Sequence, residues 1–173
     1  MKKALFLDRD GVINVEKDYL YKIEDFEFID GIFELCRYYK NLGYLIVVVT
    51  NQSGIARGYY SENDFKTLTS WMLERFLDES IEIAKVYFCP HHPDISGVCE
   101  CRKPNSGMLY EAEKDFNLDL KNSVLVGDKE RDIEAGIGAG LKTTYLFDEN
   151  KKILNSKATK IVSKLENIMD KKC

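Results

Sequence analysis

Short, uninterrupted runs of apolar residues recur along the chain. Five of them have the length of a β-strand, and their continuity is typical of strands covered on both faces. Between these runs, apolar residues recur at the spacing of three and four that indicates a helix with one buried face. The strand-like runs are 4–7, 45–49, 86–88, 124–126 and 143–146, and the helical patterns cover 32–42, 65–77, 109–116 and 133–139.

Strands that alternate with helices predict an α/β domain. Parallel strands require long crossover connections, and those connections are right-handed, so we expect a mostly parallel sheet covered by helices. Ser61 and Asp64 form a capping-box pattern at the start of the second helix, and Gly43 and Gly140 stand where helices should end. A chain of 173 residues can close one core, so we expect a single domain over residues 1–173.

Three segments depart from the alternation. Residues 11–30 and 90–105 are longer than the usual connections of an α/β unit, and long loops in compact domains are often functional. The lysine-rich tail keeps apolar residues at helical spacing, which predicts a last docked helix over about residues 156–170. The apolar residues of this predicted helix are Ile161, Val162, Leu165, Ile168 and Met169.

Charge and composition exclude several classes of protein. The chain has 25 basic and 29 acidic residues, a net charge of −4, and therefore no positive field for nucleic acid or an anionic membrane. No apolar run approaches the roughly 20 residues that span a bilayer, and the first residues lack the apolar stretch of a signal peptide. We expect a cytoplasmic protein, where five cysteines favour a metal site over a disulfide framework.

Polar side chains follow three of the predicted strands. Asp8 and Asp10 come after the first strand, the segment 50–54 (Thr-Asn-Gln-Ser-Gly) ends the second, and Asp128 and Asp132 follow the fourth. Open α/β sheets bind ligands at the carboxyl ends of their strands, so these groups should converge. Carboxylates brought that close repel one another unless a cation lies between them, and oxygen ligands of this kind suit Mg²⁺.

These motifs together resemble a known family. Asp8-x-Asp10-Gly, Thr50 after an apolar strand, Lys103, and Gly127-Asp128-x-x-x-Asp132 are similar to the four ordered motifs of phosphatases of the haloacid dehalogenase (HAD) superfamily. The resemblance covers about residues 4–147. It implies a three-layer α/β/α, Rossmann-like fold without a large cap domain.

The resemblance also implies roles for the motif residues. Asp8 would be the nucleophile that forms an aspartyl-phosphate, and Asp10 would protonate the leaving oxygen and then activate water. Thr50 and Lys103 would hold the phosphoryl oxygens. Asp8, the Asp10 carbonyl and Asp128 would bind Mg²⁺, with Asp132 supporting Asp128 from behind.

A second cluster contains three cysteines and both histidines of the chain. Cys89, His91, Cys99 and Cys101 match the Cys₃His ligand set of a structural zinc site, with His92 as the alternative to His91. Buried free cysteines are the simpler explanation, but the polar residues around them do not look like a core. Zinc would order a loop over about residues 89–103 that is too polar to fold alone, and would thereby place Lys103. Cys36 and Cys173 are read as a core thiol and a tail residue.

Within the superfamily, the sequence resembles one branch. The segments 50–58, 89–93 and 101–108 are similar to those of phosphatases of heptose bisphosphates, a branch that also includes histidinol-phosphate phosphatases. The resemblance implies removal of the C7 phosphate of a heptose 1,7-bisphosphate in the synthesis of nucleotide-activated heptose for lipopolysaccharide or related glycans. Only seven residues separate His91 from Cys99, a length nearer that of histidinol-phosphate enzymes, so histidinol phosphate or another small phosphate monoester is the alternative substrate.

A sugar bisphosphate needs contacts for its second phosphate and for its sugar. Arg102, Lys129 and the backbone amides of 51–53 are candidates for the phosphate, and Arg57 either contributes or is a solvated residue at the entry to a helix. By the resemblance, residues 16–19 also border the substrate. The complete set of expected substrate contacts is Glu16, Lys17, Asp18, Tyr19, Asn51, Gln52, Ser53, Arg102 and Lys129.

Two other classes of protein share some of these features. A receiver-like signalling domain also gathers acidic residues at one sheet edge, but it carries its phosphorylated aspartate after the third strand, which here runs into the cysteine loop. A zinc-dependent nucleic-acid module would require a basic stripe. The sequence therefore favours an enzyme, and we expect a monomer.

Overall fold

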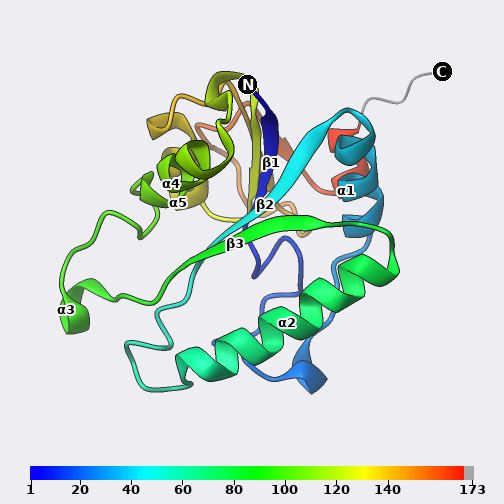
Figure 1. The fold of residues 1–173 in the computed structure, drawn as a ribbon. Coiled ribbons are helices and arrows are strands. Elements are labelled where there is room, and N and C mark those ends of the chain that lie inside the picture. The colour runs from blue at the N-terminus through cyan, green and yellow to red at the C-terminus, as the bar shows by residue number, and fades with distance from the viewer. Residues whose placement is uncertain (170–173) are drawn as a thin grey trace.

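The computed structural model describes residues 1–169, and within them the chain forms one parallel sheet flanked by helices (Figure 1). The strand order is β3-β2-β1-β4-β5-β6. The strands are β1 (Lys3–Leu7), β2 (Tyr44–Asn51), β3 (Ile83–Cys89), β4 (Val124–Gly127), β5 (Thr143–Phe147) and β6 (Lys160–Val162). The α-helices are α1 (Ile32–Asn41), α2 (Glu62–Asp78), α3 (Pro93–Ser96), α4 (Gly107–Phe116) and α5 (Glu130–Gly138), with short 3₁₀ turns at Ile23–Asp25, Leu120–Asn122 and Leu165–Ile168.

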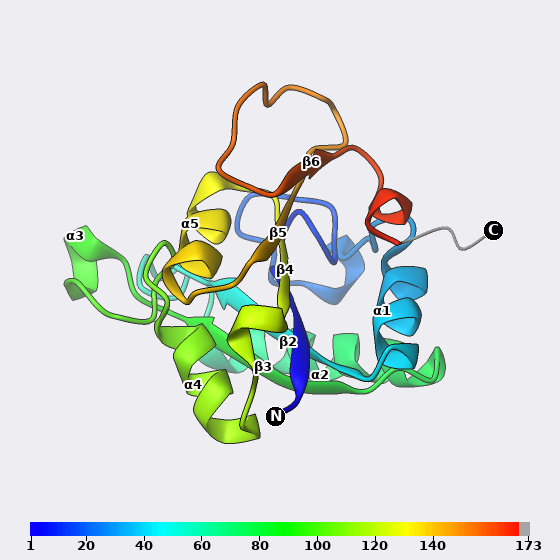
Figure 2. The same ribbon diagram turned by 90° about the horizontal axis from the view of Figure 1, so that it is seen from above.

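The sheet separates two hydrophobic cores. Successive side chains of a strand point to opposite faces, so Leu5 and Leu7 pack with α1 and α2, whereas Ala4 and Phe6 pack with α4 and α5. Helices on both faces explain why the strands read as continuous apolar runs. The views in Figures 1 and 2 show these two helical layers on either side of the sheet, and the predicted three-layer α/β/α fold is confirmed.

The centre of the sheet is a topological switch point. β1 pairs with β2 on one side and with β4 on the other, so Leu7 lies opposite both Val48 and Val126. One residue after the end of β1, the Asp8 backbone N–H donates to the Val126 carbonyl at 3.1 Å. The residues that follow these three strands are therefore brought to one crevice at their carboxyl ends.

The helix boundaries follow local sequence signals. The Ser61 hydroxyl accepts a hydrogen bond from the Asp64 backbone N–H at 3.0 Å, while the Asp64 carboxylate accepts one from the Ser61 N–H at 2.8 Å, so the predicted capping box is confirmed. Gly43 and Gly140 follow α1 and α5 with φ angles of 81° and 85°. Within residues 1–169, none of the helices combines the length and the apolar character needed to cross a membrane.

The prediction of a helix over about residues 156–170 is wrong. Residues 160–162 form β6, which pairs with β5 at Ile161 opposite Leu146 and Val162 opposite Phe147 (Figure 2), and a 3₁₀ turn over Leu165–Ile168 follows. The edge of β5 would otherwise leave its backbone groups unpaired, and this requirement overrides helical spacing. Val162, Leu165 and Ile168 are buried by the strand and turn instead. Residue 170, at the end of that predicted helix, and Cys173 lie outside the described residues.

Candidate active site

The crevice at the switch point contains a cavity of about 410 Å³. Ten of the predicted site residues line it: Asp8, Asp10, Glu16, Asp18, Tyr19, Asn51, Gln52, Ser53, Arg102 and Lys129. Thr50 and Lys103 are buried immediately behind this lining, and Asp128 lines an adjoining hollow that shares Glu16 and Lys129 with the first. The structure thus brings the motif residues to one place.

Lys103 is a buried cation of the site. Its Nζ lies 2.9 Å from Asp8 Oδ1 and 2.8 Å from Asp132 Oδ1, and it donates to the Val49 carbonyl at 2.7 Å. Although burial opposes the charged form, the carboxylates of Asp132 and Asp8 raise the pKa of Lys103. Lys103 is therefore a fixed ammonium group beside Asp8.

The environment of Asp8 disfavours its ionised form. Burial raises the pKa of Asp8 well above its ordinary range; Lys103 opposes this shift, and the charges of Asp132 and Asp128 add to it. Lys103, between Asp8 and Asp132, and Lys129, beside Asp128, bring two positive charges to three carboxylates. A further cation at this place would favour the ionised form of Asp8.

The acidic residues offer a place for that cation. Asp8, Asp128 and Asp132 each present a carboxylate oxygen, and these oxygens lie within 4.8 Å of one another. Asp128 Oδ1 is buried without a hydrogen-bond partner, which an ion would supply. The donor set consists of oxygen alone and fits Mg²⁺. Asp132 is less available than Asp128, because its carboxylate also accepts from the Lys129 N–H at 3.0 Å and contacts Lys103.

Asp10 is held by three donors. Arg9 Nη2 lies 2.9 and 3.0 Å from the two Asp10 carboxylate oxygens, and the side-chain amides of Asn14 and Gln52 donate to it at 3.1 and 3.0 Å. Arg9 is 1% exposed and also donates to the Leu20 carbonyl. Roles for Arg9 and Asn14 were not predicted from the sequence. The available signal was that Arg9 closely follows a strand predicted to be buried on both faces, where a cation needs a buried partner.

Asn51 and Gln52 support the site as well as line it. Asn51 bonds with both backbone polar groups of Lys103, and Gln52 donates to Thr50 Oγ1 at 2.9 Å and accepts from the Tyr60 hydroxyl. The Gln52 backbone N–H donates to the Cys89 carbonyl at 2.7 Å. The expectation that this amide contacts a second phosphate is therefore wrong, because the amide is already used between strands.

The loop over residues 16–20 forms one rim of the cavity. Partial burial and the nearby charges of Asp10 and Asp128 raise the pKa of Glu16 to about 7. Lys17 does not line the cavity, and its Nζ donates to the Asp25 carbonyl at 2.7 Å, so its predicted substrate contact is not supported. Adjacent residues of an irregular loop point in different directions, which sequence alone could not show.

Basic side chains also line the cavity. Lys129 Nζ lies 2.9 Å from Asp128 Oδ2, and Arg102 donates to the His91 carbonyl at 3.1 Å. Arg57 and Arg131 also line the cavity. A role for Arg57 was left open in the sequence and one for Arg131 was not predicted, because a lone basic residue in a turn or in the first turn of a helix has no distinctive pattern.

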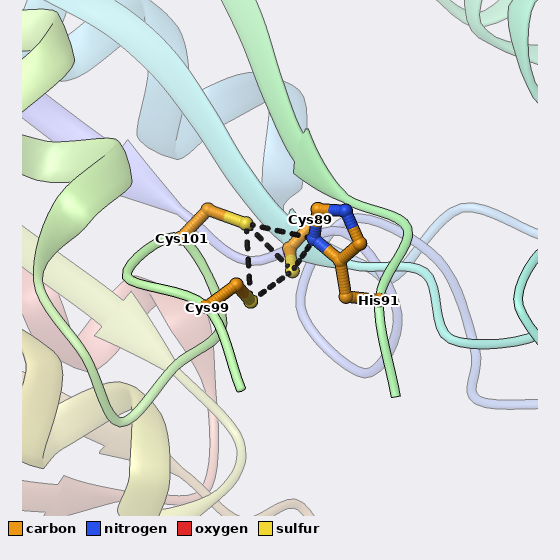
Figure 3. A group of neighbouring side chains, drawn as sticks. All are labelled: Cys89, His91, Cys99 and Cys101. Carbon is orange, nitrogen blue, oxygen red and sulfur yellow. Dashed lines mark hydrogen bonds between the residues drawn. The ribbon is translucent and has the colours of Figure 1, made fainter. Parts of the chain in front are cut away.

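The three cysteines and His91 come together in one group, as Figure 3 shows. Cys101 Sγ lies 2.9 Å from Cys89 Sγ and 3.4 Å from Cys99 Sγ, and His91 Nδ1 lies 3.3 Å from Cys101 Sγ. All four donor atoms are within 4.8 Å of one another, and the three thiols are free. This donor set fits a tetrahedral zinc ion. His91, not His92, points into the group.

Known proteins share this sequence and fold. A family model described as HAD-hydrolase-like matches residues 100–162. The D-glycero-alpha-D-manno-heptose-1,7-bisphosphate 7-phosphatase of Campylobacter jejuni is 57% identical over 150 residues, which cover 87% of this chain and 85% of that relative. The D-glycero-beta-D-manno-heptose-1,7-bisphosphate 7-phosphatase of Pasteurella multocida is 46% identical over 174 residues, 98% of this chain and 95% of that relative.

A solved structure agrees with the sequence relatives. The crystal structure of D,D-heptose 1,7-bisphosphate phosphatase from B. bronchiseptica, complexed with magnesium and phosphate, has a TM-score of 0.84 and 28% identity, and the match covers 96% of this chain and 95% of that chain. The motifs, the all-parallel sheet and these relatives agree over most of the chain. The protein belongs to the heptose-1,7-bisphosphate 7-phosphatase family of HAD-like hydrolases.

Proposed function

We propose that the protein hydrolyses the C7 phosphate of D-glycero-D-manno-heptose 1,7-bisphosphate to heptose 1-phosphate and phosphate. The observation that carries the proposal is the contact between Asp8 and Lys103 at 2.9 Å, at the end of a cavity large enough for a sugar. A carboxylate can accept a phosphoryl group, and an adjacent ammonium can stabilise the charge on that group. The family relationship supplies the substrate class.

The reaction proceeds in two displacements. An Asp8 carboxylate oxygen forms a bond to the C7 phosphorus while the bond from phosphorus to the sugar oxygen breaks, and that oxygen takes a proton from the Asp10 carboxyl group. Asp10, now ionised, then takes a proton from water as the water oxygen attacks the aspartyl-phosphate, which releases phosphate and regenerates Asp8. The three donors around Asp10 support its orientation in both steps.

Lys103 and Thr50 hold the group that is transferred. Gln52 donates to Thr50 Oγ1, so the Thr50 hydroxyl proton remains available for a phosphoryl oxygen. Lys103 reaches the same oxygens from beside Asp8. Both side chains are buried, which strengthens their interaction with a charged phosphoryl group.

We infer that Mg²⁺ is the catalytic ion and that Asp8, Asp128 and the Asp10 carbonyl hold it. When bound, Mg²⁺ neutralises charge on the carboxylates and on the phosphoryl oxygens. The unpartnered Asp128 Oδ1 supports this assignment. Zinc is the proposed occupant of the Cys₃His group, where its role is structural because all four positions are filled by side chains.

The α anomer is the proposed preferred substrate. The relative named for the α anomer is 57% identical to this chain, whereas the relative named for the β anomer is 46% identical. The product would enter nucleotide-activated heptose synthesis for lipopolysaccharide or a related glycan. We propose a cytoplasmic location, because free thiols suit a reducing compartment, and a monomeric state.

Phosphate release tests the proposal directly. The purified protein with Mg²⁺ is compared on both anomers of heptose 1,7-bisphosphate, on heptose 7-phosphate and on histidinol phosphate. We expect the α-bisphosphate to be preferred over histidinol phosphate by at least about 100-fold in kcat/KM, equivalent to about 2.7 kcal/mol of transition-state binding. Equal rates on all four esters would overturn the heptose assignment, and a preference for histidinol phosphate would establish the alternative.

A further inference from the structure

Arg57 lines the cavity but has no part in the proposed chemistry. It lies in the turn that follows β2, where its backbone N–H donates to the Ser53 carbonyl at 3.1 Å. Its guanidinium joins the other two loops of the cavity: Nη2 lies 2.8 Å from His92 Nε2, and Cζ lies 5.8 Å from the centre of the Tyr19 ring. Arg57 therefore occupies the point where three loops meet.

The contact with His92 has a defined direction. A guanidinium has no lone pair to offer, so Arg57 Nη2 donates and His92 Nε2 accepts at 2.8 Å. The other ring nitrogen of His92, Nδ1, lies 3.3 Å from the Asp94 backbone nitrogen and 3.9 Å from the Asp94 carboxylate. His92 is thus held between Arg57 and Asp94.

The positive charge of Arg57 is not neutralised by these partners. Neither an imidazole nitrogen that accepts nor a phenol ring supplies a negative charge, in contrast to the Asp128 carboxylate that pairs with Lys129. The charge of Arg102 likewise has an uncharged partner, since its side chain donates to the His91 carbonyl. Two guanidinium groups with uncharged partners thus line one cavity, and together they suit a dianionic phosphate.

Successive residues of the cysteine loop hold both groups. His91 places its ring among the thiols and its carbonyl on Arg102, while His92 places its ring on Arg57. An ordered His91 therefore holds in place both the carbonyl that contacts Arg102 and the neighbouring ring that contacts Arg57. The cysteine loop is thus connected to the cavity by these side-chain contacts as well as through the backbone that continues to Lys103.

We propose that Arg57 is a specificity residue that binds the phosphate that is not transferred, the one on C1, and that His92 is its positioning residue. This inference rests on the proposed function, because it assumes a sugar that carries two phosphates. It explains why the cavity wall contains a positively charged side chain that contacts neither Asp8 nor Lys103 in any of its described hydrogen bonds or ring contacts. It also extends the role of the cysteine loop from local folding to substrate selection.

Arg57→Gln tests the specificity role on two substrates that differ only at C1. We expect kcat/KM for heptose 1,7-bisphosphate to fall about 10- to 100-fold, and kcat/KM for heptose 7-phosphate to change less than about 2-fold. Calorimetric binding of heptose 1-phosphate should weaken by a similar factor, which reports on the subsite without turnover. Arg75→Gln on the outer face of α2 is the matched control and should leave all three values unchanged.

The outcomes separate the two proposals. Equal losses on both sugar substrates would mean that Arg57 is merely structural, and unchanged values would remove it from the subsite; either overturns the inference. If the wild-type protein hydrolyses neither sugar ester, the proposed function itself fails.

His92→Phe and His92→Gln test the positioning role. The phenyl ring cannot accept from Arg57, so His92→Phe should raise KM for the bisphosphate and weaken heptose 1-phosphate binding, with kcat and zinc content retained. The carboxamide oxygen of His92→Gln can accept, and we expect it to restore most of the binding. Wild-type binding by His92→Phe, or loss of kcat in both variants, would contradict the positioning role.

Discussion

Asn51 forms a pair of hydrogen bonds with the backbone of Lys103: its Oδ1 accepts from the Lys103 N–H at 3.0 Å, and its Nδ2 donates to the Lys103 carbonyl at 3.1 Å. Residues 52 positions apart in the chain are thereby locked together at the end of β2. From this backbone position the ammonium group of Lys103 lies 2.9 Å from Asp8 Oδ1. Asn51 thus positions the backbone of Lys103.

Replacing Asn51 should impair turnover more than substrate affinity. In Asn51→Ala the backbone groups of Lys103 lose both partners, so we expect kcat to fall about 10- to 100-fold and the free energy of unfolding to fall by about 1–3 kcal/mol. Steady-state kinetics and urea unfolding measure the two effects. Asn63→Ala on the exposed surface of α2 is the control. A rise in KM alone would show instead that Asn51 acts as a substrate contact.

Asp8→Asn should abolish turnover while the fold remains. The carboxamide is nearly the same size but cannot attack phosphorus, so we expect a loss of at least about 10³-fold in kcat. Asp78→Asn, at the exposed end of α2, should behave as the wild type. Circular dichroism and zinc content check that the structure is retained. Substantial phosphate release by Asp8→Asn would remove Asp8 as the nucleophile.

Gly11→Ala should weaken the acidic site. A Cβ at Gly11, where φ is +87°, would lie 2.3 Å from Asp128 Oδ2, so the carboxylate would have to move. We expect a higher Mg²⁺ concentration for half-maximal activity in addition to backbone strain of about 1–3 kcal/mol. Gly43→Ala is a matched control, because Gly43 has a φ of +81° with no atom within 4 Å of its Cβ position. If both variants show the same Mg²⁺ dependence, Gly11 does not shape the site.

Cys101→Ser should abolish zinc binding. Loss of one ligand from the Cys₃His group should remove a large part of a binding energy on the order of 10 kcal/mol, and with it the order of the loop. We expect a lower melting temperature, near-zero zinc by elemental analysis and reduced turnover through Lys103 and Arg102. Cys36→Ser changes a buried thiol outside the group and should destabilise the core with zinc unchanged. Full zinc content in Cys101→Ser would remove Cys101 from the ligand set.

The pKa of Glu16 predicts a pH dependence of stability. Because the pKa is raised from 4.5 to about 7 in the folded state, the contribution of Glu16 is fully present below about pH 4.5 and is lost as the pH rises through about 7. In the metal-free protein, Glu16→Gln should therefore gain stability relative to the wild type between pH 4.5 and pH 8. Solvent at the rim screens the effect, so we expect less than about 1 kcal/mol. Parallel pH profiles of thermal unfolding for the two proteins would contradict it.

Local sequence patterns predicted the buried strands, the start of α2 and the two groups of metal-binding residues. Continuous apolar runs indicated buried parallel strands, the Ser61 capping box marked the start of α2, and the crossover rule then required that residues after β1, β2 and β4 meet at one edge. The acidic motif and the cysteine cluster could be read as two separate metal groups because their ligand types differ. These inferences depend on short-range periodicity and on donor chemistry, both of which are properties of the sequence.

The supporting contacts were decided by tertiary structure alone. The helix predicted at the C-terminal end became β6, because the free edge of β5 needed a partner. Gln52 on Asp10, Asn51 on Lys103 and His92 on Arg57 join loops whose relative directions depend on how the whole sheet packs. A sequence shows which side chains carry chemistry, whereas the orientation of each one depends on partners that are distant in the chain, and only the folded backbone determines those partners.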